Sequence, residues 1–185
     1  MKRIVILLLC LMLCGCRAAD GAMDRGLALR GSLLQSSGCE MDVTVTADYG
    51  DKTYTFAVGC QFDAHGKLSF TVTSPETISG ISGTVDAEGG NLTFDDVALA
   101  FPLLADEQLS PISAPWVFMK TLRGGYITAA GEIDRSVRLI IDDRYEEDAL
   151  TLHIWLDGEG NPSLGEIYHN GRRILTVEVN TFHIL

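Results

Sequence analysis

The chain has 185 residues, of which 14 are Lys or Arg and 25 are Asp or Glu, so its formal net charge at pH 7 is −11. This acidity argues against nucleic-acid binding, which depends on basic side chains that neutralise phosphates, and against adhesion to anionic lipid through surface charge. The length suits a single domain with a substantial hydrophobic core.

The chain begins with a short basic and apolar segment. Lys2 and Arg3 precede an apolar run of eleven residues, from Ile4 to Cys14. A helix needs about 20 apolar residues to cross a bilayer, so this segment is typical of a secretory signal.

The end of this segment, Leu13-Cys14-Gly15-Cys16, resembles a bacterial lipobox. The resemblance implies a lipoprotein signal peptide at residues 1–15, acyl chains such as palmitate on Cys16, and a lipidated tether at residues 16–22. Two or three acyl chains hold a protein firmly on a bilayer, so we expect a protein anchored to the cell membrane and exposed on its extracytoplasmic side. An uncleaved signal anchor and a plain secretory signal are the alternatives. Cleavage would remove two basic residues and leave 12 against 25 acidic ones, a formal charge of −13.

Two cysteines, Cys39 and Cys60, flank a clear pair of alternating strands. If the chain folds about Tyr49-Gly50, apolar residues of the two strands face each other and Cys39 lies opposite Cys60. Directly opposed residues in antiparallel strands are close enough for a disulfide, and an exported protein would allow one. The pattern therefore predicts a Cys39–Cys60 disulfide, with free thiols or a metal site as alternatives.

Further strands follow in the first half of the chain. The turn Asp63–Lys67 places Gly66 where a left-handed conformation is needed and leads into an alternating strand around Phe70. A hairpin about Gly89-Gly90 would set Val85 opposite Phe94. We expect about five antiparallel strands with one apolar face by this point.

Two helices are predicted, one before the strands and one between them. In residues 22–36, Met23, Leu27 and Leu34 lie near one helical face. The second helix begins near Ser110 and Pro111, carries an apolar stripe that includes Trp116, and ends at Gly124-Gly125. Its position within a run of strands predicts a lid across the sheet.

Strands resume after the second helix, at residues 136–142, 149–156, 163–168 and 173–182. The turn around Asn170-Gly171 is the strongest hairpin signal in the chain. The sequence thus predicts an α+β fold, with an open antiparallel half-barrel of about ten strands, an N-terminal helix and a helical lid.

The sequence offers little for catalysis. Its four histidines are scattered, and no nucleophile motif, zinc motif or phosphate loop occurs. Asp157–Asn161 has the spacing of a calcium loop, but Pro162 occupies the position that requires Gly. We therefore predict a protein that is not an enzyme and that has no cofactor and no metal site.

The apolar residues, in contrast, suggest a ligand cavity between the sheet and the second helix. The candidate lining residues are Val43, Val45, Phe56, Val58, Phe70 and Phe94 from the sheet, with Trp116 and Met119 from the helix. The alternative is that sheet and helix pack together as a dry core.

Two stretches resemble proteins of the LolA/LolB-like family of lipoprotein carriers and receptors. The first is Phe70–Ile81 followed by Gly90–Asp95, where a strand ends in a proline motif. The second runs from Trp155 through Asp157, Pro162 and Gly171 to the strand ending near Phe182. The similarity spans residues 23–185 in element order. It implies an incomplete β-barrel whose concave face, covered by helices, holds acyl chains of a lipid or lipoprotein.

These observations predict a membrane-anchored lipoprotein that binds a hydrophobic ligand, either a lipid or an acyl chain, and that does not bind nucleic acid. The alternative is a structural or interaction lipoprotein with a solid core, which works with another envelope protein.

Overall fold

The computed structural model describes residues 17–94, 97–102, 104–105, 108–134, 136–146 and 149–185. Its main feature is one antiparallel sheet in the order β6-β5-β4-β3-β2-β1-β13-β12-β11-β10-β9. The first strands are β1 (Gly38–Asp48), β2 (Thr53–Asp63), β3 (Leu68–Ser74), β4 (Ser82–Asp86), β5 (Gly89–Phe94) and β6 (Val97–Phe101). The others are β9 (Tyr126–Ile133), β10 (Ser136–Asp142), β11 (Thr151–Leu156), β12 (Pro162–His169) and β13 (Arg172–Ile184).

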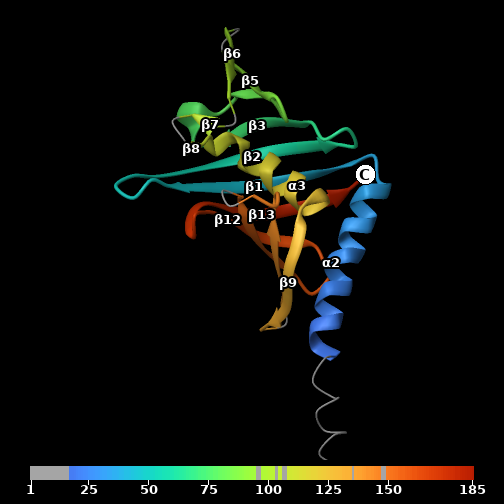
Figure 1. Ribbon diagram of the computed structural model, residues 1–185. Coiled ribbons are helices and arrows are strands. Elements are labelled where there is room, and N and C mark those ends of the chain that lie inside the picture. Colours follow the sequence, from blue (N-terminus) through green and yellow to red (C-terminus); the bar gives the residue numbers. More distant parts are fainter. Residues whose placement is uncertain (1–16, 95–96, 103, 106–107, 135, 147–148) are drawn as a thin grey trace, which may run out of the picture.

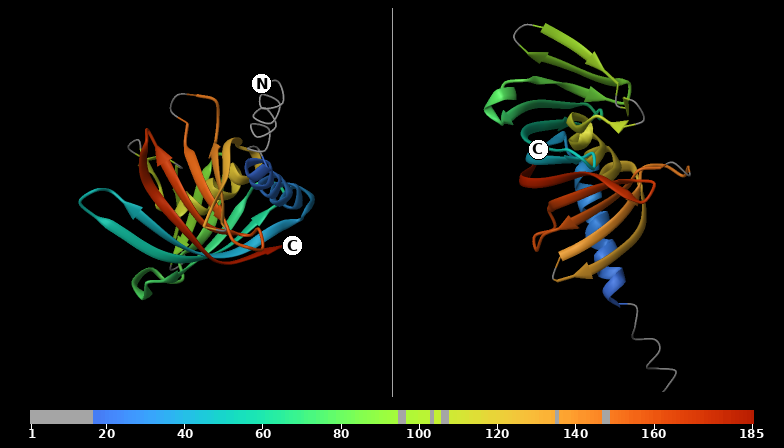
Figure 2. Two further views of the ribbon diagram at one scale, coloured as in Figure 1. Left: turned by 90° about the horizontal axis from the view of Figure 1, so that it is seen from below. Right: turned by 90° about the vertical axis from the view of Figure 1, so that its left-hand side faces the viewer.

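The sheet is open, and it curves around two helices that lie on its concave side (Figures 1 and 2). These helices are α2 (Arg17–Gln35), which packs on β9 and β10, and α3 (Ala114–Gly124), which crosses the middle of the sheet. Short elements fill the connections: η1 (Glu76–Ile78), the pair β7 (Leu104–Ala105) and β8 (Gln108–Leu109), and η2 (Pro111–Ser113). The predicted fold class is confirmed, with eleven strands in the sheet instead of about ten.

Helix α2 begins at Arg17, so it takes in most of the segment that the sequence assigned to a tether. Its buried face consists of Ala22, Gly26, Leu29 and Leu33, spaced at one helical period. A Cβ at position 26 would lie 2.8 Å from the Leu139 side chain, so glycine allows the close approach of α2 to β10. The predicted face is wrong, because Leu27 and Leu34 are exposed.

The register of the first hairpin also differs from the prediction. Cys39 lies opposite Phe62, and Cys60 lies opposite Met41. A two-residue turn would require positive φ at Tyr49. The chain instead forms a longer loop in which Gly50 takes φ of 90° and the Tyr49 N–H donates to the Lys52 carbonyl at 3.0 Å.

This register makes Cys39 and Cys60 diagonal neighbours, and both are free thiols in the structure. Diagonal neighbours in a sheet are about 7–8 Å apart, beyond the usual range of a disulfide. Burial raises the pKa of Cys39 to about 11 and raises that of Cys60 further. The structure therefore does not contain the predicted disulfide.

The β4–β5 hairpin turns earlier than predicted. Val85 pairs with Gly90 and not with Phe94, which pairs instead with Val97 of β6. The shift moves Phe94 away from the middle of the sheet and places it on the β5–β6 hairpin, where the candidate site lies.

Candidate functional site

Seven of the eight residues predicted to line a cavity belong to the hydrophobic core or pack against it. The exposed fraction is 0–4% for Val43, Val45, Val58, Phe70, Trp116 and Met119, and Phe56 is partly buried against them. Side chains of the sheet and of α3 thus cover each other. That these residues line a ligand cavity stays a prediction.

Helix α3 is fixed to the sheet at several points. The Trp116 indole N–H donates to the Gly66 carbonyl at 2.8 Å, and the Arg123 guanidinium donates to the Asp63 carbonyl at 3.1 Å. From the other helix, Arg30 donates to the Leu122 carbonyl at 2.8 Å. These contacts connect α3 both to the β2–β3 turn and to α2, as expected for a packed element of the core.

Phe94 is the exception among the predicted residues, because it is 40% exposed. It belongs to a row of side chains on the β5–β6 hairpin that the register places on the same face as the core. Gly90 pairs with Phe101, Leu92 with Leu99, and Phe94 with Val97. Gly90 also pairs with the buried Val85. We call Leu92, Phe94, Val97, Leu99 and Phe101 the apolar strip.

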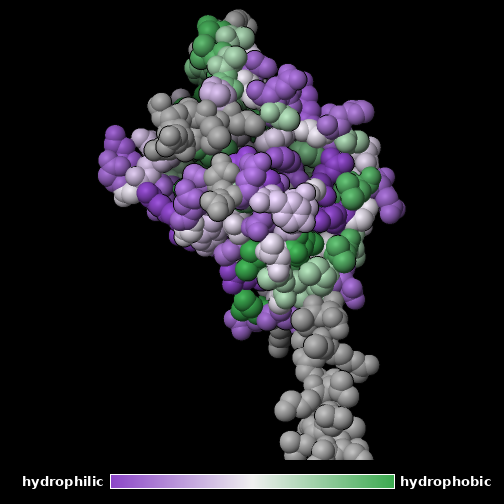
Figure 3. Space-filling view, in the orientation of Figure 1, coloured by the Kyte–Doolittle hydropathy of each residue, from purple (hydrophilic) through white to green (hydrophobic). Residues whose placement is uncertain are grey.

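The apolar strip becomes more exposed along its length. Phe101 is partly buried, and its ring occupies the position that a Cβ at Gly90 would take. Leu99 and Val97 are each 57% exposed. Figure 3 shows hydrophobic residues gathered at this hairpin, at the end of the molecule opposite the start of α2. Contiguous exposed apolar surface is typical of interaction or ligand sites.

The chain segment that contains the apolar strip carries one sign of charge. The sequence between Lys67 and Lys120 contains no Lys, Arg or His. The same interval contains seven acidic residues: Glu76, Asp86, Glu88, Asp95, Asp96, Asp106 and Glu107. A ligand or partner of this part of the chain should therefore be neutral or cationic.

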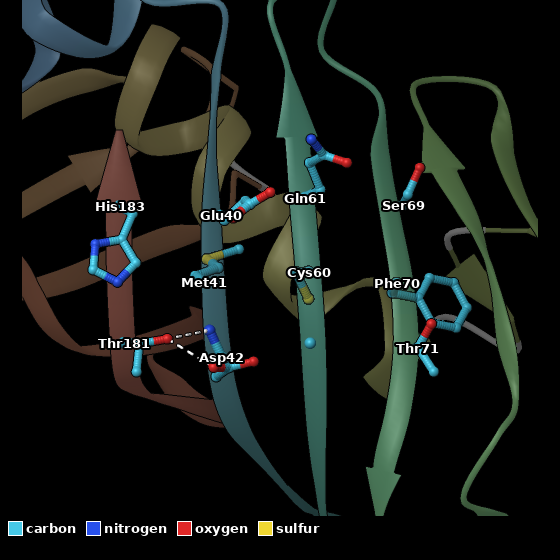
Figure 4. Close-up of a pocket in the computed structure, with 11 residues that line it drawn as sticks. Glu40, Met41, Asp42, Cys60, Gln61, Ser69, Phe70, Thr71, Thr181 and His183 are labelled. Atoms are coloured by element: carbon cyan, nitrogen blue, oxygen red, sulfur yellow. Dashed lines mark hydrogen bonds between the residues drawn. The ribbon is translucent and has the colours of Figure 1, made fainter. Parts of the chain in front are cut away.

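The outer face of the sheet is polar where the inner face is apolar. A groove of about 500 Å3 lies across β13, β1, β2 and β3 (Figure 4). Its polar lining comes from Glu40, Asp42, Gln61, Ser69, Thr71, Thr181 and His183. Gly59 leaves the space beside Asp42, whose carboxylate accepts a hydrogen bond from Thr181 at 2.8 Å. These carboxylates and hydroxyls do not suit an acyl chain.

The outer face of the C-terminal strands carries a network of polar side chains, in which the buried Nε of Arg138 has no hydrogen-bond partner. Arg138 contacts the His153 imidazole at 2.8 Å, and Glu166 accepts hydrogen bonds from Tyr168 and Arg173. Burial and Arg138 lower the pKa of His153. Burial alone would raise the pKa of Glu166, but its two hydrogen bonds outweigh this effect and the pKa is lowered. We therefore interpret these side-chain contacts as stabilising the sheet.

The part of the chain that the structure describes contains no group of three or more side chains suited to a metal ion. Nor does it contain a helix that is long and apolar enough to span a membrane. Cys16, the predicted lipidation site, lies outside the described residues.

Most of the apolar strip was not predicted from the sequence, although two signals were present. Val97–Phe101, with the sequence VALAF, is an uncharged run beside two aspartates, and the surrounding interval has no basic residue. An apolar segment of this kind is normally read as a core strand, so only its exposure in the fold identifies it as a surface.

No known protein-family model matches the sequence, and no curated protein sequence matches it. Similar solved structures include a LolA superfamily protein from Nitrosomonas europaea, with 9% identity, coverage of 91% of this chain and 94% of that chain, and a TM-score of 0.46. A putative outer membrane lipoprotein-sorting protein domain from Vibrio parahaemolyticus has 7% identity, coverage of 89% and 92%, and a TM-score of 0.46. The lipoprotein LppX from Mycobacterium tuberculosis has 12% identity, coverage of 88% and 93%, and a TM-score of 0.41. The similar structures therefore include a LolA superfamily protein, in agreement with the family resemblance noted in the sequence. Identities this low show a likeness of fold alone.

Proposed function

We propose that this protein is a non-enzymatic envelope lipoprotein, anchored through Cys16 on the extracytoplasmic side of the cell membrane, that binds an acyl chain along the apolar strip. The observation that carries the proposal is the exposure of contiguous apolar side chains on the core side of the β5–β6 hairpin. The site differs from the predicted cavity, whose candidate lining residues, apart from Phe94, are buried or partly buried between the sheet and α3.

The dimensions of the apolar strip suit a chain of moderate length. The strand residues from Gly90 to Phe94 span about 14 Å at about 3.4 Å per residue, the length of an extended acyl chain of about eleven carbons. Because the strip is open, it covers only one side of the ligand. Each methylene should therefore contribute roughly half of the ~0.8 kcal/mol that its complete burial provides. The sum is about 4 kcal/mol, which corresponds to a Kd of about 1 mM.

The charge of the surroundings limits the head group. With seven acidic and no basic residues between Lys67 and Lys120, an anionic head group would be repelled. We therefore expect a zwitterionic or cationic amphiphile to bind better than an anionic one of equal chain length.

The proposal can be tested by titrating the soluble domain, residues 17–185, with dodecylphosphocholine below its critical micelle concentration. Methyl NMR should show shifts at Val97 and Leu99, with a Kd near 1 mM. Leu99→Ser should weaken binding at least fivefold. Ala98→Ser, on the opposite face of the same strand, is the control and should not. Shifts confined to the core under α3, or equal binding by both variants, would contradict the proposal.

The second candidate is a structural or interaction lipoprotein without a ligand. It is supported by the burial of most of the predicted cavity residues between the sheet and α3. Absence of any shift with dodecylphosphocholine and with its cationic analogue dodecyltrimethylammonium would support this candidate over the first.

A further inference from the structure

The two edge strands of the sheet differ in what covers them. At one edge, β9 packs against α2. At the other edge, β6 pairs only with β5, and within the described residues no strand lies along its outer side. Figures 1 and 2 show β6 at the margin of the molecule. Its outer row of N–H and C=O groups is therefore available for pairing.

Strand β6 also lacks the features that normally prevent pairing at an edge. Natural edge strands are protected by charged residues, proline or a bulge. The residues Val97–Phe101 contain no charge and no proline, their pairing with β5 is regular, and four of the five are exposed. The edge is thus chemically suited to accept a further strand.

The charge of the region decides between two occupants, a second copy of this chain and a different partner. A second copy would bring the same base-free acidic interval against itself, and like charges disfavour such an interface. A pairing limited to five residues also falls short of the roughly 1,200 Å2 that stable protein complexes bury. A segment with basic residues has neither an unfavourable charge nor a need to form a large rigid interface.

We infer that β6 is a docking edge for an extended segment of an envelope protein in which apolar residues alternate with Lys or Arg. The segment adds to the sheet beyond β6. Its apolar side chains extend the face that carries Leu99 and Val97, and its basic side chains complement the net negative charge of the interval between Lys67 and Lys120. Strand addition uses the same hairpin as the proposed ligand site but different groups, namely backbone atoms at the edge instead of side chains on the inner face.

The test uses a fluorescently labelled peptide of alternating lysine and valine, KVKVKV, and the soluble domain of residues 17–185. Fluorescence anisotropy should show saturable binding that weakens as salt is raised. A KVKPKV peptide, which keeps all three lysines and in which proline removes a backbone donor, should bind at least fivefold more weakly. Amide hydrogen exchange should slow in β6 when KVKVKV is bound.

A matched pair of variants separates edge pairing from general charge attraction. Ala98→Lys places a charge on the edge strand and should weaken KVKVKV binding at least fivefold. Thr93→Lys places the same charge on β5, directly opposite Ala98 and also exposed, and should change binding less than twofold. Equal losses in the two variants, equal binding of the two peptides, or protection outside β6 would each overturn the inference. Failure of dodecylphosphocholine binding would leave it intact, because the edge does not depend on the acyl site.

Discussion

Replacement of Trp116 distinguishes a packed core from a lid over an empty space. The indole ring is 4% exposed, and its N–H donates to the Gly66 carbonyl at 2.8 Å. Truncation of a buried Trp to Ala costs about 3–5 kcal/mol, because both apolar burial and packing are lost. Trp116→Phe keeps most of the ring but loses the hydrogen bond, so we expect a smaller loss of about 1–2 kcal/mol.

The free energy of unfolding should be measured by urea denaturation followed by far-UV circular dichroism. A loss of about 3–5 kcal/mol corresponds to a fall in Tm of roughly 6–20 °C for a domain of this size. Leu34→Ala is a suitable control, since Leu34 is 57% exposed on α2, and it should change stability by about 0.5 kcal/mol or less. If Trp116→Ala folds normally and loses less than about 1 kcal/mol, α3 is not packed as the structure places it, and the predicted cavity becomes the better interpretation.

Three further predictions concern other parts of the fold. Gly90→Ala would bring a Cβ within 2.1 Å of the Phe101 ring, so we expect a loss of about 1–3 kcal/mol in urea denaturation; an unchanged midpoint would contradict this packing. Cys39 and Cys60 should resist the thiol reagent DTNB at pH 8 in the folded protein and react on unfolding, because burial raises the pKa of Cys39 to about 11 and that of Cys60 as well; rapid labelling of the folded protein would refute their burial. Burial and a neighbouring guanidinium lower the pKa of His153 below its ordinary 6.5. Between that lowered pKa and pH 6.5, the unfolded chain therefore binds a proton that the folded protein does not. The free energy of unfolding should fall as the pH drops through the folded pKa. NMR titration of the imidazole checks this, and a pKa at or above 6.5 would disprove it.

The sequence was sufficient where a local signal determines a unique geometry. At Asn170-Gly171 both residues take positive φ, as the favoured two-residue hairpin turn requires, and β12 and β13 begin and end close to the predicted ranges. Gly66 likewise takes φ of 90° in the predicted short loop, which is closed by a hydrogen bond from the Asp63 N–H to the Lys67 carbonyl at 2.9 Å. In these turns the chemistry of one or two residues fixes the register.

The sequence was insufficient where only the alternation of side chains was available. Alternation fixes which face a residue occupies, but a shift of two or four residues leaves the faces unchanged. The first hairpin is shifted by two residues, which separates Cys39 from Cys60, and the β4–β5 hairpin is shifted by four, which separates Val85 from Phe94. The predicted disulfide and the predicted position of Phe94 both depended on register, so both failed while the assignment of faces was correct.

The position of the apolar strip relative to the proposed anchor restricts what the strip can contact. Helix α2 has 19 residues and a length of about 28 Å, and its first residue lies at the end of the molecule opposite the β5–β6 hairpin (Figure 1). An anchor at Cys16 would place the bilayer beside the start of α2, so the hairpin would point away from it and would meet a partner or ligand arriving from the other side. In lipidated protein on vesicles that contain spin-labelled lipid, a fluorophore at Asp24→Cys should therefore be quenched, and one at Thr93→Cys should not. Quenching at position 93 would mean that the hairpin contacts the protein's own membrane, and the apolar strip would then be a second membrane contact instead of a site for an incoming molecule.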